Sequence, residues 1–234
     1  MLKNLRTTTE FFVPGSGLDV AAYILAGHKQ GIHHLGRYQW ASGVIRRRSP
    51  RRILDVACGA GYGAKMYADA CPGSEVIGVD YDKRAVKWAR EHYAAPNLSY
   101  RVGDMVTWSY DDGSPMQEFD AVSSFDTIEH LLHREIALIQ LAEHVAVDGV
   151  LLFSTPCGHG VTRLNPEWEH HKIEYSHVDL RNLMQRFFGT ILAPDDGTLP
   201  DLSFWTDVIN AGTPRYLNRF NPIACLDPIR KRGR

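Results

Sequence analysis

The sequence predicts an α/β domain in which a parallel sheet is covered by helices. From about Arg51, short apolar runs alternate with segments of helical periodicity, which is typical of this architecture. A glycine cluster follows the first apolar run, and polar residues end the next ones. The composition, 44% hydrophobic and 23% charged, is that of a globular chain of 234 residues rather than a disordered or disulfide-rich one.

The first part of the predicted sheet consists of two strand–helix pairs. The apolar run 52–57 predicts a strand, which the glycine cluster ends before a helix at 62–70. The run 75–80 predicts the second strand. Its helix is expected to begin after Asp82, because aspartate caps helix N-termini and apolar residues follow it at helical spacing.

The remaining elements continue the alternation. Strands are expected at 98–102, 119–125 and 150–154, and a helix at about 177–188. Another helix, between the last two of these strands, is expected to bury one apolar face made of Leu131, Leu132, Ile136, Ile139 and Val145. Weaker strand candidates are Ile191–Leu192 and Phe204–Ile209.

Three regions are expected along the chain. Residues 1–45 lack a strand pattern and are rich in aromatics, so they are interpreted as a helical cap and lid over one end of the sheet. Residues 46–212 form the main domain. Residues 213–234, with three prolines, are interpreted as an irregular C-terminal tail.

The bulk properties exclude several classes of protein. The formal net charge of −1 gives no overall attraction to a polyanion, and the basic runs at 46–52 and 230–234 are interpreted as solvated surface. The four cysteines are widely spaced, which indicates reduced thiols rather than a zinc or redox motif. No secretory signal or membrane span is evident, so a soluble, cytoplasmic protein is expected.

Glycines and carboxylates stand at the ends of three predicted strands, where ligands bind in an open parallel sheet. Gly59 and Gly61 let the backbone turn sharply and approach a ligand. Asp80 can accept hydrogen bonds from both hydroxyls of a ribose. Asp104 can accept one from an adenine amino group, and Met105 can pack on the ring. A nucleoside is therefore expected here.

The glycine loop alone leaves alternatives open. Its spacing, Gly59-x-Gly61-x-x-Ala64, also fits a looser dinucleotide fingerprint, or a turn that is purely structural. Asp55 favours another ligand, because a carboxylate before the loop suits the ammonium of a methionine moiety better than a pyrophosphate. Asp104 points the same way.

Taken together, these motifs resemble those of the class I S-adenosylmethionine-dependent methyltransferases. Residues 53–63, Ile-Leu-Asp-Val-Ala-Cys-Gly-Ala-Gly-Tyr-Gly, resemble motif I, and 79–82 and 103–105 resemble the second and third motifs. Residues 119–122 with 128–130 resemble the fourth, and the likeness spans about 35–190. It implies a seven-stranded Rossmann-like fold with an antiparallel last hairpin. The cofactor-binding residues that it implies for S-adenosylmethionine are Asp55, Ala57, Gly59, Gly61, Asp80, Tyr81, Gly103, Asp104, Met105 and Phe125.

A second set of residues follows the fourth and fifth predicted strands. Asp-x-x-Glu-His at 126–130 and His-x-x-Glu-Tyr at 171–175 resemble metal-dependent O-methyltransferases, the ubiquinone-pathway enzymes in the first half and the small-RNA 2′-O-methyltransferases in both. The resemblance implies Mg²⁺ that binds the acceptor hydroxyl and lowers its pKa. Its ligands here would be Asp126, Glu129, His130 and His171, with Asp126 where those families have Glu. So many histidines around a hard cation are unusual.

Bacterial methyltransferases of glycan and natural-product pathways provide a broader resemblance. The shared residues are Arg37-Tyr38, the Gly-Tyr-Gly of motif I, Ser-Phe-x-x-Ile-Glu-His, Ser-Thr-Pro, and Asn-Pro-x₄-His-x-x-Glu-Tyr. In that group metal use is not uniform. Glu129, His130 and His171 are then the catalytic candidates, with either imidazole as a general base. The alternative interpretation is structural: Glu129 complements a helix N-terminus and His130 is a packed ring.

The favoured hypothesis is O-methylation of a small acceptor, namely the hydroxyl of a sugar or natural product. An RNA ribose 2′-O-methyltransferase, with Arg46–Arg52 on phosphates, is the second hypothesis, against which the near-neutral charge counts. A non-catalytic cofactor-binding partner protein and a nicotinamide dehydrogenase are further alternatives. A small-molecule or glycan acceptor is therefore expected, and neither nucleic acid nor membrane.

Overall fold

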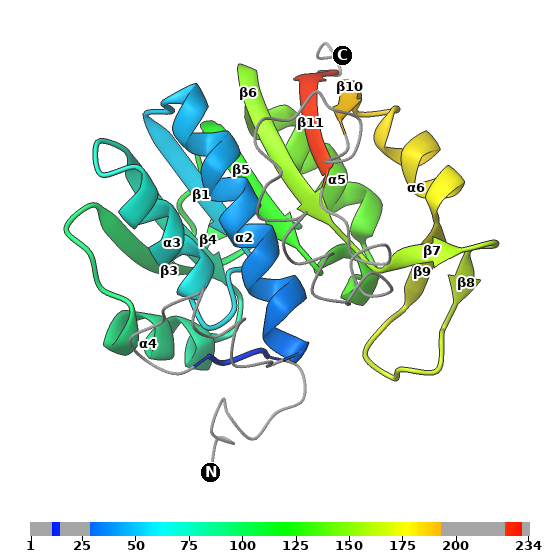
Figure 1. The fold of residues 1–234 in the computed structure, drawn as a ribbon, viewed down its shortest axis with the longest axis horizontal. Helices are drawn as coiled ribbons and strands as arrows, with labels where there is room; N and C mark the ends of the chain where they lie inside the picture. The colour runs from blue at the N-terminus through cyan, green and yellow to red at the C-terminus, as the bar shows by residue number, and fades with distance from the viewer. Residues whose placement is uncertain (1–10, 15–28, 193–222, 231–234) are drawn as a thin grey trace.

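A computed structural model describes residues 11–14, 29–192 and 223–230 (Figure 1). A sheet of eight strands runs through the molecule: β1 (Arg52–Val56), β2 (Glu75–Asp80), β3 (Leu98–Asp104), β4 (Ser109–Tyr110), β5 (Phe119–Phe125), β6 (Val145–Ser154), β10 (Phe188–Leu192) and β11 (Ile223–Pro228). Their order across the sheet is β10-β11-β6-β5-β1-β2-β3-β4.

The strand directions match the expected fold. Strands β3, β2, β1, β5 and β6 pair in parallel, and β11 is antiparallel to both β6 and β10. The seven-stranded arrangement with an antiparallel last hairpin is therefore confirmed. The eighth strand, β4, is a two-residue addition that pairs antiparallel with the end of β3.

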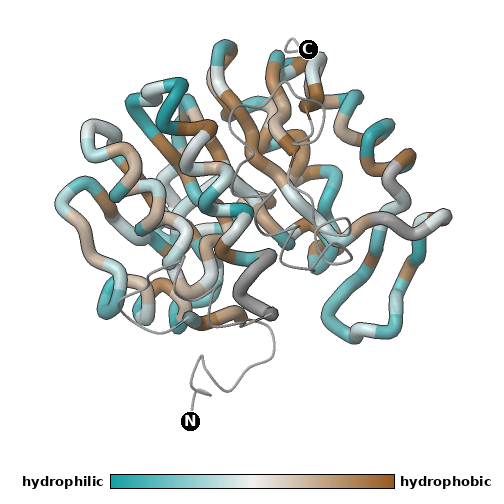
Figure 2. Tube along the Cα trace, in the orientation of Figure 1, coloured by the Kyte–Doolittle hydropathy of each residue, from teal (hydrophilic) through white to brown (hydrophobic). Residues whose placement is uncertain are grey.

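Helices cover both faces of the sheet (Figure 1). Helices α2 (Lys29–Arg48), α3 (Tyr62–Ala70) and α4 (Lys83–His92) pack on one face, and α5 (Arg134–His144) and α6 (His177–Met184) on the other. Because successive strand residues point to opposite faces, Ile53 joins the first core layer and Leu54 the second. Figure 2 shows these apolar strands in brown beneath more hydrophilic helices.

Helix α2 crosses the boundary that the sequence predicts between cap and domain at residue 45. Leu35, Ala41 and Ile45 are fully buried in the same core layer as α3 and α4. This part of the expected cap is thus an integral layer of the domain, because its apolar face has the sheet to pack against. The rest of the predicted cap lies outside the described residues, apart from 11–14.

The predicted irregular tail at 213–234 is wrong for β11. This strand lies between β10 and β6, and Ala224 and Cys225 are buried. Pairing with a strand on each side stabilises β11, although its six residues are too few to predict a strand from the sequence. Pro228 is its last residue and lies beyond Cys225, where the pairing with β6 ends, so a missing amide hydrogen is tolerated there. The weak candidate Ile191–Leu192 belongs to β10, whereas Phe204–Ile209 lies outside the described residues.

The predicted apolar face of α5 is also wrong. Leu132 precedes the helix and is 74% exposed, and Ile136 is 46% exposed. A 3₁₀ turn, η2 (Ile128–His130), comes first, and α5 begins only at Arg134. That offset rotates the helix, so the residues facing the core are Ala137, Leu138, Leu141 and Ala142. Helix α6 also ends before the expected residue 188, because Phe188 begins β10.

A small second sheet lies beyond the carboxyl end of β6. Its strands β7 (Cys157–His159), β9 (Ile173–Ser176) and β8 (Arg163–Leu164) have the order β7-β9-β8. The loop 165–172 between β8 and β9 is mostly hydrophilic (Figure 2). Across the described segments, the helices are too short or too polar to cross a bilayer.

Candidate active site

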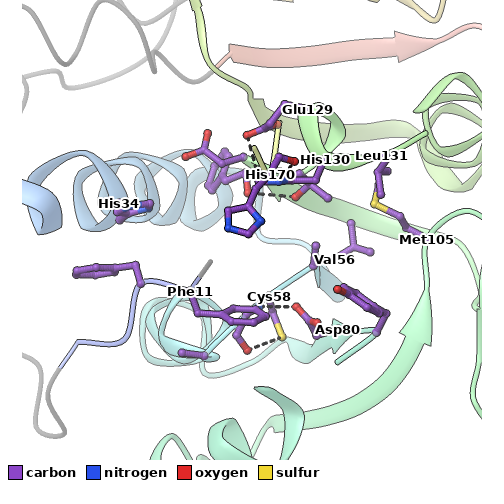
Figure 3. A pocket seen from close by; sticks show the side chains of 18 of the residues that line it. Phe11, His34, Val56, Cys58, Asp80, Met105, Glu129, His130, Leu131 and His170 are labelled. Atoms are coloured by element: carbon purple, nitrogen blue, oxygen red, sulfur yellow. Dashed lines mark hydrogen bonds and ion pairs between the residues drawn. The ribbon is translucent and has the colours of Figure 1, made fainter. Parts of the chain in front are cut away.

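A cavity of about 680 Å³ opens at the carboxyl ends of β1, β2, β3 and β5, a size and place typical of a cofactor site. In Figure 3, Asp80 lies across it from Glu129, His130 and His170, and these residues belong to two groups in its lining. We call Ala57, Gly59, Asp80, Asp104 and Met105 the glycine-loop half. We call Glu129, His130, Trp168, His170 and His171 the histidine half.

The glycines of the loop after β1 have different tasks. Gly59, with φ of 54°, lines the cavity, and a Cβ atom there would lie 3.4 Å from the Phe11 ring. Gly61, with φ of 89°, does not line it. A Cβ on Gly61 would come 2.4 Å from the Cβ of Ala89, so this glycine serves the packing of α3 against α4. Gly61 was predicted to contact the ligand, but it is not among the residues that line the cavity.

Asp80, at the end of β2, is held by the backbone on both oxygens. The amide of Gly59 donates to its Oδ2 at 2.8 Å, and the amide of Asp82 donates to its Oδ1 at 2.9 Å. Each carboxylate oxygen has capacity for a second hydrogen bond. The carboxylate is thus oriented before any ligand arrives.

The end of β3 contributes the residues expected around an adenine. Asp104 is exposed and accepts a hydrogen bond from the amide of Val106 at 2.7 Å, and Met105 is buried against the cavity. Gly103 allows the close passage of β4, because a Cβ there would lie 2.9 Å from the Ser109 carbonyl oxygen. Tyr81, 69% exposed, and buried Phe125 complete the predicted residues that line this side.

Asp55 lies below the cavity and not in its wall. It is fully buried and accepts hydrogen bonds from the hydroxyls of Ser123 at 2.6 Å and Tyr38 at 3.1 Å. Its Oδ2 has no hydrogen-bond partner among the described residues. Burial, against which these two hydrogen bonds act, raises the pKa of Asp55 to about 7. Asp55 is therefore not among the residues that line the cavity, and its contact with a ligand ammonium stays a prediction.

Asp126 is bound by an arginine of helix α2. The guanidinium of Arg37, 1% exposed, pairs with both carboxylate oxygens at 2.5 Å, and the same guanidinium donates to the Ser154 hydroxyl at 2.9 Å. Asp126 adopts a φ of 49° at the end of β5. Because the arginine occupies this carboxylate, the expected role of Asp126 as a fourth metal ligand is not supported.

Glu129 is the innermost residue of the histidine half. It lies in η2 and is fully buried, and its Oε2 accepts a hydrogen bond from the Thr155 hydroxyl at 2.8 Å. Its Oε1 lies 3.8 Å from Nε2 of His130 and has no hydrogen-bond partner among the described residues. Burial, together with the charge of Asp126, raises the pKa of Glu129 well above its ordinary value.

The loop 165–172 brings His171 to the same place. The amide of Lys172 donates to the Glu129 carbonyl at 2.6 Å, which ties this loop to η2. Nδ1 of His130 lies 3.0 Å from the His170 carbonyl oxygen, and the ring of Trp168 lies 4.4 Å from that of His171.

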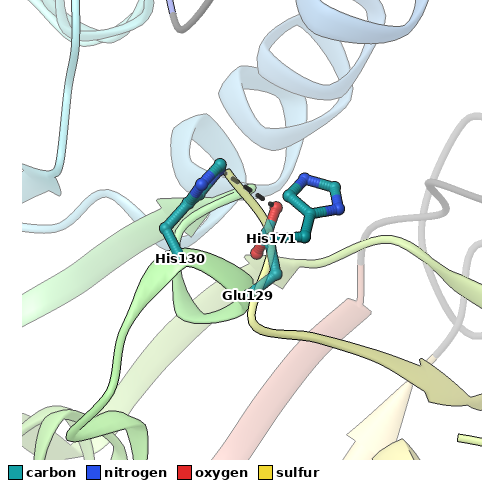
Figure 4. A group of neighbouring side chains, drawn as sticks. All are labelled: Glu129, His130 and His171. Atoms are coloured by element: carbon teal, nitrogen blue, oxygen red, sulfur yellow. Dashed lines mark ion pairs between the residues drawn. The ribbon is translucent and has the colours of Figure 1, made fainter. Parts of the chain in front are cut away.

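Three potential ligand atoms, one each from Glu129, His130 and His171, lie within 4.8 Å of one another (Figure 4). Among the residues that the structure describes, they are the one group of this kind that could hold a metal ion. The three side chains can hold a divalent cation or receive protons from a hydroxyl group.

Sequence patterns missed several residues of the site. Arg37 stands in the Arg-Tyr motif, yet its pairing with Asp126 joins positions 89 residues apart. The only sequence signal for Trp168 was its position shortly before His170 and His171. Glu174 offered a clearer signal, since it stands three residues after His171, and its carboxylate lies 2.8 Å from that ring.

Residues 32–187, more than half of the chain, match the family described as "Methyltransferase domain". The chain belongs to the class I S-adenosylmethionine-dependent methyltransferases. Its glycine-loop half, with an oriented Asp80 and the side-chain-free wall at Gly59, fits S-adenosylmethionine.

Two curated relatives illustrate the range of the family. A protein of Mycolicibacterium smegmatis named "probable S-adenosylmethionine-dependent methyltransferase" is 34% identical over 113 residues, 48% of this methyltransferase and 41% of that protein. A malonyl-[acyl-carrier protein] O-methyltransferase of Bacillus cereus is 24% identical over 183 residues, 78% of this chain and 64% of that protein. The chain thus spans less than two thirds of either relative.

A solved structure supports the fold. The O-methyltransferase of a trans-AT polyketide synthase multienzyme of Brevibacillus brevis, in complex with S-adenosyl-L-homocysteine, gives a TM-score of 0.57. The match covers 92% of this methyltransferase and 84% of that chain at 11% sequence identity, so the likeness concerns the fold alone.

Proposed function

We propose that this methyltransferase transfers the methyl group of S-adenosylmethionine to a hydroxyl of a small polar acceptor, such as a sugar or a natural product. The observation that carries the proposal is the convergence of Glu129, His130 and His171 in the cavity that the glycine-loop half also lines. The first half fits a nucleoside, and the second provides proton acceptors beside it.

The residues of the glycine-loop half have separate tasks in this proposal. Asp80 accepts hydrogen bonds from the two ribose hydroxyls, and its orientation by two backbone amides supports that role. Asp104 accepts one from the adenine amino group, with Met105 and Tyr81 beside the ring. When bound, S-adenosylmethionine supplies a methyl group on a sulfonium that is already activated for displacement.

The histidine half orients the acceptor and removes its proton. Glu129 and His130 hold the hydroxyl, and His171 receives its proton. As the acceptor oxygen forms the new O–C bond, its proton passes to the imidazole, and the electron pair of the broken S–C bond stays on sulfur. Positioning contributes most of the rate, because the leaving group needs little help.

One of the compared proteins supports an oxygen acceptor. The Bacillus cereus relative is named an O-methyltransferase of malonyl-[acyl-carrier protein]. At 24% identity, this relative supports the class of reaction rather than one substrate.

The test is incubation of the purified protein with labelled S-adenosylmethionine and panels of glycans, small phenols and RNA. Label should enter a glycan or a phenol, and His171→Ala should lower that rate roughly a hundredfold with cofactor binding unchanged. Methylation of RNA alone would favour the ribose methyltransferase instead. An unchanged rate in both His130→Ala and His171→Ala would remove the catalytic role from this cluster.

A divalent cation at Glu129, His130 and His171 is the second candidate. The closeness of their ligand atoms favours it, whereas the pairing of Asp126 with Arg37 leaves three protein ligands rather than four. Such a cation would lower the pKa of the acceptor hydroxyl. Treatment with a chelator distinguishes a metal-dependent reaction from one with histidine as the base. If a metal is required, activity disappears and returns when Mg²⁺ or Mn²⁺ is added. If histidine is the base, the chelator does not change the activity.

A further inference from the structure

The imidazole of His171 has a partner that lies outside the cavity. Its Nδ1 is 2.8 Å from Oε1 of Glu174, which lies on β9 three residues later. Both side chains are at least nine-tenths buried, at 7% and 10% exposure. Glu174 is not among the residues that line the cavity, whereas His171 is. Any effect of Glu174 on a bound acceptor therefore passes through the imidazole.

This contact determines which ring nitrogen carries the hydrogen. An ionised carboxylate can only accept hydrogen bonds, so the nitrogen that faces it must donate. Nδ1 of His171 is then the protonated nitrogen, and in the neutral ring Nε2 keeps the lone pair. The opposite tautomer would direct a lone pair at the carboxylate and leave Nε2 without basic character.

Other contacts already hold the ring in place. The amide of His171 donates to the Trp168 carbonyl at 3.0 Å, which fixes the backbone of His171, and the imidazole packs edge to face on the Trp168 ring with centroids 4.4 Å apart. The tautomer, by contrast, has one determinant in the geometry described, which is the carboxylate of Glu174. Removing its charge should therefore change the proton distribution in the ring more than the position of the ring.

We propose that Glu174 is a positioning residue that keeps His171 protonated on Nδ1, so that Nε2 is available for the proton of the acceptor hydroxyl. The proposal rests on the proposed function of His171. It assigns to the His-x-x-Glu spacing a physical task, the selection of one tautomer.

The test compares the wild-type protein with Glu174→Gln, which keeps the volume and removes the charge. In protein labelled with ¹⁵N-histidine, NMR of the ring nitrogens should show His171 as the Nδ1–H tautomer in the wild type and as a mixture in the variant. The His171→Ala variant assigns the signals. A wild-type ring protonated on Nε2, or an unchanged pattern in Glu174→Gln, would overturn the proposal.

The second arm measures turnover with whichever acceptor the wild type methylates. Glu174→Gln should lower kcat roughly ten- to a hundredfold, as loss of an orienting partner does at other sites, and leave KM within a few-fold. Loss through KM alone, or an unchanged kcat, would contradict the positioning role. The matched control is Glu167→Gln, which changes an exposed glutamate of the loop 165–172 that does not line the cavity, and this variant should match the wild type.

Further controls distinguish a loss of folding from a loss of activity, and a failure of the proposed function from a failure of the proposed role of Glu174. Thermal unfolding and calorimetry with S-adenosylmethionine should give wild-type values for Glu174→Gln, because its contact lies away from the glycine-loop half. If the wild type methylates no member of the panels, the proposed function fails. The NMR arm then still decides whether Glu174 selects the tautomer.

Discussion

The two halves of the cavity are held together by different means. In the glycine-loop half, backbone amides orient the carboxylate of Asp80, and the shape of the wall depends on a positive φ at Gly59. In the histidine half, side chains orient one another, as Glu174 orients His171 and Thr155 orients Glu129. The first half is therefore most sensitive to changes of backbone conformation, and the second to changes of single side-chain atoms.

The largest expected effect is that of Gly61→Ala. A Cβ at this position would lie 2.4 Å from Ala89 and 2.9 Å from the Tyr100 ring, at a φ of 89°. Strain and overpacking together should lower the free energy of unfolding by about 4 kcal/mol. Gly59→Ala should cost only about 1 kcal/mol, because its Cβ meets Phe11 at an ordinary contact distance. Urea unfolding of both variants makes the comparison, and equal losses would contradict it.

Arg37 connects helix α2 to the carboxyl ends of β5 and β6, where it contacts Asp126 and Ser154. Arg37→Met would leave Asp126 without its buried partner and should lower the free energy of unfolding by about 3 kcal/mol. Arg48→Met is the control on the same helix, because within the described part of the chain this exposed arginine donates to a carbonyl and to no carboxylate, and the variant should stay within about 0.5 kcal/mol of wild type. If both arginines prove equally dispensable, the ion pair contributes no stability.

Substitution of Asp80 tests whether the glycine-loop half binds the nucleoside of the cofactor. Asp80→Ala removes the proposed acceptor for two ribose hydroxyls, so affinity for S-adenosylmethionine should fall roughly a hundredfold, about 2.7 kcal/mol. Calorimetry measures it. His130→Ala, in the other half, should bind the cofactor as the wild type does. Unchanged affinity in Asp80→Ala would remove this residue from the proposed cofactor site.

A smaller effect than those of Gly61, Arg37 and Asp80 is expected from Asp55, as a pH dependence of stability. Because the folded state raises the pKa of Asp55 to about 7, the folded state holds this proton more tightly than the unfolded chain. Its contribution to stability is complete below about pH 4 and is lost as the pH rises through 7. Between pH 6 and 8 the wild type should lose about 1.4 kcal/mol relative to Asp55→Asn. Parallel stability curves for the two proteins would contradict this.

The contrast between the halves also explains what the sequence could predict. Gly59 follows β1, and Asp80 and Asp104 are the last residues of β2 and β3, so strand periodicity alone brings them to one edge. The gathering of Glu129, His130 and His171 in one cavity was also predicted, through resemblance to other methyltransferases. The pairing of Arg37 with Asp126 was not, because no local pattern records which carboxylate a helix 89 residues away will reach.

Asp55 shows a different limit of sequence patterns. Its place before the glycine loop indicated a ligand contact, yet its side chain points into the core, toward Ser123 and Tyr38. In a strand, the direction of a side chain alternates with each residue, and covering helices decide which direction is solvent and which is core. The same reasoning applies to β11, whose burial depends on neighbours far away in the chain.

The position of β11 also has a consequence for synthesis on the ribosome. Among the described strands, β10 reaches the rest of the sheet through β11, which pairs with Leu151, Leu152 and Phe153 of β6. In a nascent chain, β6 therefore lacks its β11 partner until residues 223–228 have been translated. Unpaired strand edges are sites of aggregation. The β6 side of the sheet should thus be the part of the emerging polypeptide that chaperones protect longest.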